Sequence, residues 1–104
     1  MAGFLFVYHG GSMPGTPEEG AKVMAKWQAW IKGAGAALSD PGAGVGKSST
    51  VNADGSVSDS GGANPAMGYS LVEAADLGAA QKLAKGCPHL EYGGSIEIAP
   101  VMQM

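Results

Sequence analysis

The chain has 104 residues, which is enough for one domain, residues 1–104, and too few for two. Hydrophobic residues make up 45% and charged residues 14%, and the net charge is −3 with six Lys and no Arg. This balance argues against a nucleic-acid partner, and no apolar run approaches the length of a membrane span. The single Cys87 excludes an internal disulfide and predicts a cytoplasmic location.

The first third of the chain predicts a strand followed by a helix. Residues 3–9 form an apolar and aromatic run that is typical of a strand. Residues 16–31 begin with a capping box, formed by the first residue and Glu19, and continue with apolar residues at helical spacing. Gly33 and Gly35 are expected to end this helix.

The middle of the chain, residues 36–66, is rich in Gly, Ser and Asp and is predicted to be an insertion. Within it, residues 48–58 predict a short exposed hairpin that turns at Asp54-Gly55. The insertion is expected to be either a mobile flap or an addition to the edge of the sheet. Gly46-Lys47-Ser48 resembles the end of a phosphate-binding loop, but the earlier glycine of that motif is missing.

The last third predicts a second strand–helix–strand unit. Strands are expected over residues 68–74 and 95–101, and a helix over residues 76–85, with Leu77 on its buried face. Together with the first third, this pattern predicts an α+β ferredoxin-like sandwich, in which two helices cover one face of an antiparallel sheet.

Strand alternation predicts which side chains lie on the face of the sheet that the helices leave open. His9, Ser70, Ser95 and Glu97 are expected there, whereas Phe4 and its alternate neighbours face the helices. An apolar sheet face is not stable in water. The sequence therefore predicts a homodimer that forms through the open face.

The chain resembles the YCII-related (DGPF) family. The name-giving DGPF segment corresponds to residues 59–62, and helix one lacks the His that some members are proposed to use. The resemblance implies a dimeric α/β barrel and a small-molecule pocket between the sheet, helix one and the Gly-rich middle loop. The segments that carry the resemblance are Phe6-Val7-Tyr8-His9-Gly10, Gly68-Tyr69 with Leu71-Val72-Glu73-Ala74, Ala84 through Cys87-Pro88, Gly93-Gly94-Ser95-Ile96-Glu97-Ile98 and Pro100-Val101-Met102.

Three residues are candidates for acid–base catalysis. His9 ends the first strand, where its ring could act as a general base at the rim of the sheet. Asp40 follows helix one, and Glu97 lies in the middle of the last strand. The alternatives are a rim His bonded to backbone, an Asp that stabilises its own turn and a solvated edge-strand Glu.

Tyr8, Trp27, Ser70 and Ser95 are the candidate ligand-binding residues. A tryptophan at such a position belongs to the core more often than it stacks on a ligand. His89 follows a proline in a loop and is expected on the surface. Two His and one Cys without ligand spacing predict no metal site, and no motif indicates a cofactor.

Two functions follow from these expectations. The first is a small cytoplasmic protein that binds a small metabolite in a barrel pocket and acts on it by acid–base chemistry through His9, Asp40 or Glu97. The alternative is a non-catalytic module that binds a ligand or another protein. Clustering of His9 with a carboxylate in one cavity would favour the enzyme.

Overall fold

The computed structural model describes residues 2–11 and 15–102. In chain order, the helices and strands are β1 (Ala2–Gly10), α1 (Pro17–Ala34), the 3₁₀ turn η1 (Gly35–Ala37), β2 (Asp40–Gly44), β3 (Thr50–Val51), β4 (Val57–Ser58), β5 (Ala66–Ala74), α2 (Leu77–Lys85), the 3₁₀ turn η2 (Pro88–Tyr92) and β6 (Gly94–Pro100).

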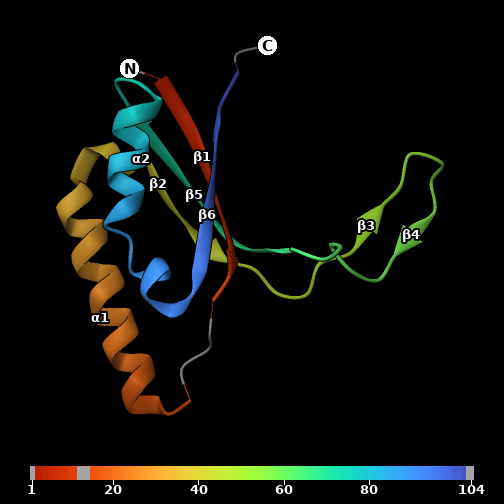
Figure 1. Cartoon of the computed structure of the whole chain (residues 1–104), viewed down its shortest axis with the longest axis horizontal. Coiled ribbons are helices and arrows are strands. Elements are labelled where there is room, and N and C mark those ends of the chain that lie inside the picture. The colour runs from red at the N-terminus through yellow and green to blue at the C-terminus, as the bar shows by residue number, and fades with distance from the viewer. Residues whose placement is uncertain (1, 12–14, 103–104) are drawn as a thin grey trace.

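Within the described residues, four strands form one sheet in the order β2-β5-β1-β6, and every neighbouring pair is antiparallel. Both helices lie on the same side of this sheet (Figure 1). The predicted mixed α+β architecture is therefore confirmed, and the strand order is compatible with a ferredoxin-like fold. The middle segment adds a separate two-stranded hairpin, β3–β4, which projects away from the sheet and the helices (Figure 1).

Helix α1 begins where the capping signals predict. The Thr16 side chain accepts a hydrogen bond from the Glu19 backbone N–H at 3.1 Å, while the Glu19 carboxylate accepts one from the Gly15 N–H at 2.9 Å. The C-terminal prediction was partly wrong, because the helix continues through Gly33 and Ala34, and only Gly35 caps it. Gly35 can end the helix because its φ of 57° is accessible to glycine.

The core lies between the sheet and the two helices. Phe4, Phe6 and Tyr8 alternate along β1 and are buried, as the predicted strand period requires. Leu77, expected on the buried face of α2, is instead 46% exposed. It occupies the first turn of α2, whereas the buried face of this helix is formed by Ala80 and Ala84 further along.

Ser70 was assigned to the open face of the sheet, and this was wrong. It pairs with Phe6 across β1 and β5, so it points toward the helices with Phe6, and none of it is exposed. A polar side chain can occupy this position because it finds hydrogen-bond partners there. The Ser70 hydroxyl contacts the Tyr8 hydroxyl and the Pro41 carbonyl.

The Gly-rich middle segment contributes to the sheet through β2. This strand pairs with β5 at its edge, with an irregularity between Asp40 and Ala43. Of the two alternatives left open by the sequence, residues 40–44 therefore form an addition to the edge. At the irregularity, Gly42 has a φ of 73°, and a Cβ there would overlap the Tyr69 carbonyl oxygen. Only glycine fits this close approach of two backbones.

Replacing Gly42 by Ala should lower the free energy of unfolding by about 2–3 kcal/mol, because the new Cβ requires both a strained φ and separation of β2 from β5. Urea unfolding followed by circular dichroism measures this loss. Gly46→Ala is the matched control, since no atom lies within 4 Å of a Cβ at Gly46 and its φ is not positive. A Gly42→Ala protein as stable as the Gly46→Ala protein would contradict the assignment.

Candidate functional site

A groove of about 720 Å³ lies between helix α1 and the edge of the sheet formed by β2 and β5. Helix α1 supplies one wall, the glycines of β2 supply the other, and the end of β1 and the η2 turn contribute one aromatic ring each. The resemblance described above implied a pocket at this place, between the sheet, helix one and the Gly-rich middle segment. The residues that line the groove are Tyr8, Gly20, Val23, Met24, Trp27, Ile31, Pro41, Gly42, Ala43, Gly44, Met67, Gly68, Tyr69 and His89.

Aromatic rings from three separate elements meet at this groove. Tyr8 lies at the centre, with its ring 5.3 Å from the Trp27 ring and 5.3 Å from the His89 ring, both edge to face. Trp27 in turn packs edge to face on Trp30 at 5.7 Å. Such contacts fix the rings relative to one another. The groove therefore has a rigid aromatic side.

A buried chain of hydrogen bonds supports the groove from behind. Ser70 donates to the Pro41 carbonyl at 2.7 Å, and because its hydroxyl has one proton, it must accept from the Tyr8 hydroxyl, 2.8 Å away. Burial raises the pKa of the Tyr8 phenol, so that it stays protonated and able to donate. The chain links β1, β5 and β2, and so holds the edge strand against the sheet.

Asp40 has a structural contact at the start of β2. Its carboxylate accepts a hydrogen bond from the Gly42 backbone N–H at 2.8 Å, which is the turn-stabilising alternative weighed for this residue. It thereby supports the backbone that lines the groove. Asp40 pairs with Leu71 on β5, whereas His9 pairs with Ala66, so about 17 Å of strand separates these two positions.

His9 and Glu97 contact each other on the opposite face of the sheet. The His9 Nε2 lies 2.9 Å from the Glu97 carboxylate, and its Nδ1 lies 3.2 Å from the Pro65 carbonyl. Both partners are acceptors, so the ring satisfies both only as the imidazolium. The hydrogen bond to Glu97 raises the pKa of His9. Partial burial lowers this pKa, but by less, and the contact with the Pro65 carbonyl raises it further. The Glu97 side chain itself is 66% exposed.

The predicted site residues thus separate into two groups. Tyr8 and Trp27 line the groove on the helix side. His9 and Glu97 form a pair on the open face, and Ser95 is exposed on β6 opposite His9. Their roles in binding or catalysis stay predictions. The sheet itself divides the expected single site, because neighbouring residues along a strand point to opposite faces.

His89 is the groove residue that sequence reasoning missed. It was expected on the surface, but it is partly buried, and its Nε2 lies 2.8 Å from the His9 backbone carbonyl. Glycines make room for its ring, since a Cβ at Gly94 would overlap it and one at Gly11 would come within 3.0 Å. The two Gly-Gly pairs, at 10–11 and 93–94, were the only signal in the sequence that a ring approaches the backbone here.

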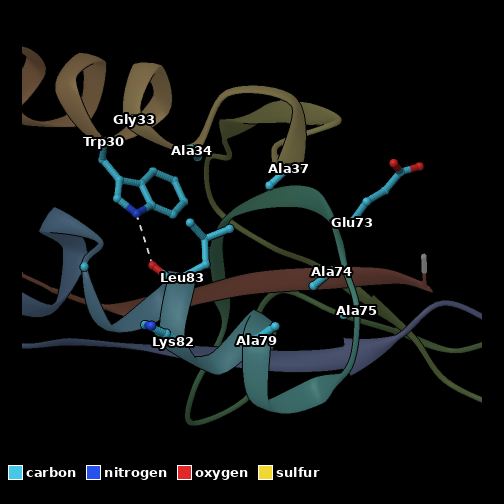
Figure 2. Close-up of a pocket in the computed structure, with 11 residues that line it drawn as sticks. Trp30, Gly33, Ala34, Ala37, Glu73, Ala74, Ala75, Ala79, Lys82 and Leu83 are labelled. Atoms are coloured by element: carbon cyan, nitrogen blue, oxygen red, sulfur yellow. Dashed lines mark hydrogen bonds between the residues drawn. The ribbon is translucent and has the colours of Figure 1, made fainter.

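A second hollow, of about 570 Å³, lies between the two helices (Figure 2). It is lined mainly by small residues of α1, β5 and α2, with Trp30 donating to the Leu83 carbonyl at 3.2 Å. Figure 2 shows the Glu73 carboxylate pointing away from the other side chains. Among the residues that the structure describes, no polar groups converge on this hollow. It is a gap left where the two helices pack, and it lacks the features of a ligand site.

Neither metal chemistry nor a reactive thiol is indicated in residues 2–11 and 15–102. No group of three or more His, Cys, Asp or Glu side chains there could hold a metal ion. Burial raises the pKa of the Cys87 thiol to about 11, so the thiol is protonated at neutral pH and packs as a small apolar group. No helix in this part of the chain is both long and apolar enough to cross a bilayer.

Comparison of the chain with protein-family models finds no match, and comparison with curated proteins finds none either.

Replacing Glu97 by Gln should lower the pKa of His9, because the carboxylate that favours the imidazolium is lost. In the parent, the pair stabilises the fold below the ordinary His pKa of about 6.5, and this contribution is lost as pH rises through the raised pKa of the folded protein. Titration of the His9 ring by NMR measures the shift. Asp40→Asn is the control and should leave the His9 pKa unchanged; an equal shift in both variants, or in neither, would contradict the pairing.

Proposed function

We propose that the protein is a homodimer that binds a small, largely apolar molecule in the groove between α1 and the β2–β5 edge. The observation that carries this proposal is the composition of the groove, in which the Tyr8, Trp27 and His89 rings meet the flexible side chain of Met24. Small-molecule sites are typically concave, apolar and aromatic, with few polar groups. Methionine side chains adapt to the shape of a ligand.

Binding without catalysis is the better-supported of the two functions considered. An acid and a base would have to reach the same reacting atoms. His9 and Glu97 do lie within hydrogen-bond reach of each other, but they are on the face of the sheet opposite the groove and do not line it. The Asp40 carboxylate instead caps the β2 turn. Enclosure of the ligand by aromatic rings needs no proton transfer.

The open face of the sheet supports the proposed dimer. Leu5, Val7, Leu71 and Ala99 form its apolar part and are only half-buried in the single chain, with no helix to cover them. A second copy packed on this face would bury them and would give the dimeric α/β barrel implied by the resemblance to YCII-related proteins. Membership of that family, like a cytoplasmic location, stays part of the proposal.

The second candidate is an acid–base site at the dimer interface. One observation favours it: His9 is mostly buried and holds Glu97 at 2.9 Å on the face where the partner would lie. Burial by a partner would remove water from the pair and strengthen its interaction. Because both ring nitrogens of His9 face acceptors, this site would supply a proton rather than remove one.

The groove can be tested with indole as a neutral aromatic probe. Indole should shift the backbone amide signals of Gly42 and Gly44 and the indole N–H of Trp27 in ¹H–¹⁵N spectra. Met24→Asp should weaken binding about tenfold, because a charge at the groove wall must be desolvated. Met102→Asp makes the same change at a position 80% exposed and remote from the groove, and it should leave the affinity unchanged. Shifts confined to other surfaces would refute the site.

Sedimentation equilibrium at micromolar concentration should give about twice the chain mass of 10.3 kDa. Leu71→Asp should shift the protein toward monomer, because a charge would be buried in the interface. Leu77→Asp, on the exposed start of α2, is the control and should keep the dimer. A stable monomeric parent at high concentration would rule out the proposed assembly.

A further inference from the structure

We infer that His89 is the polar recognition group of the groove, and that the ligand is a flat aromatic molecule that donates an N–H or O–H hydrogen bond to the His89 Nδ1. This inference rests on the proposed groove and specifies which chemistry it selects. It uses a residue that neither the predicted catalytic set nor the predicted ligand-binding set contained.

The protonation of His89 follows from its one fixed hydrogen bond. The Nε2 atom lies 2.8 Å from the His9 backbone carbonyl, which can only accept, so Nε2 carries the proton and donates. In the neutral imidazole the other nitrogen, Nδ1, then holds a lone pair. Within residues 2–11 and 15–102, no hydrogen bond engages this Nδ1. His89, a residue that lines the groove, therefore has one ring nitrogen free to accept a hydrogen bond.

The ring is held in place before any ligand arrives. The Nε2 side of the ring lies against Gly94, where a Cβ would overlap it. A Cβ at Gly11 would come within 3.0 Å of Cε1 and 3.5 Å of Nδ1, and the Tyr8 ring packs against the His89 ring at 5.3 Å. The backbone carbonyl fixes its rotation. A ligand that bonds to Nδ1 consequently loses little affinity to ordering of the side chain.

Two other polar groups nearby are already engaged. The Tyr8 hydroxyl donates to Ser70, and the Ser70 hydroxyl donates to the Pro41 carbonyl. The remaining side chains of the walls are apolar or aromatic, including Val23, Trp27 and Ile31. This combination selects a planar apolar body with a hydrogen-bond donor at its edge. An analogue whose edge carries only an acceptor would place two lone pairs against each other.

Indole and benzofuran provide the test, because they share a bicyclic shape and differ in having an N–H donor or a ring oxygen. The parent should bind indole about tenfold more tightly than benzofuran, as measured by ¹H–¹⁵N titration. His89→Gln should remove this preference, so that indole and benzofuran bind with about the same affinity. The glutamine amide can still donate to the His9 carbonyl, and circular dichroism checks that the fold is kept.

A second measurement does not depend on the variant. In the parent, the ¹⁵N signal of the His89 Nδ1 should move toward the hydrogen-bonded range when indole binds and should not do so with benzofuran. Equal affinities for the two probes with shifts at the groove, or a preference that survives in His89→Gln, would overturn the role of His89 and leave the proposed function standing. Failure of both probes to shift any groove residue would instead overturn the proposed function and this inference with it.

Discussion

The buried hydrogen-bond chain from Tyr8 through Ser70 to the Pro41 carbonyl is the interaction on which the rest of the structure depends. Proline has no backbone N–H, so this part of the edge strand relies on its carbonyl for attachment. An unpaired carbonyl here would cost about 1–3 kcal/mol. By satisfying it, Ser70 holds β2 beside β5 and orients the Tyr8 ring. The groove, with β2 on one side and Tyr8 within it, exists because of this attachment.

The sheet separates two kinds of surface. On the helix side, aromatic rings and Met24 line a groove, and on the other side an apolar face carries the His9–Glu97 pair. The two surfaces nevertheless touch through one residue, since the His9 side chain lies on the open face while its backbone carbonyl anchors His89 beside the groove. A change in the packing of the open face would therefore reach the groove through the backbone at the end of β1.

Local signals predicted most of the secondary structure. Thr16 caps its helix as expected, and Asp76 caps the helix predicted to begin there, because an N-cap needs only residues three positions apart. Asp54-Gly55 forms the predicted hairpin turn for the same reason. An addition to the sheet edge was one of two alternatives for the middle segment, but the residues that form it were not predicted, since Asp40-Pro41-Gly42 has the composition of a turn. Strand β2 is extended only because the distant strand β5 supplies its hydrogen-bond partners.

The sequence by itself determined the α+β architecture and the alternation that buries Phe4, Phe6 and Tyr8. These properties depend on the spacing of apolar residues along each strand and helix and on residues that are close together in the chain. Tertiary structure alone decided that Ser70 faces the helices, that His9 and Glu97 lie across the sheet from the groove, and that His89 lies within it. Each of these depends on partners 29 to 88 residues away, as in Ser70 with Pro41 and His9 with Glu97. A single sequence contains no local signal for contacts between such distant residues, because they arise only when the strands pair.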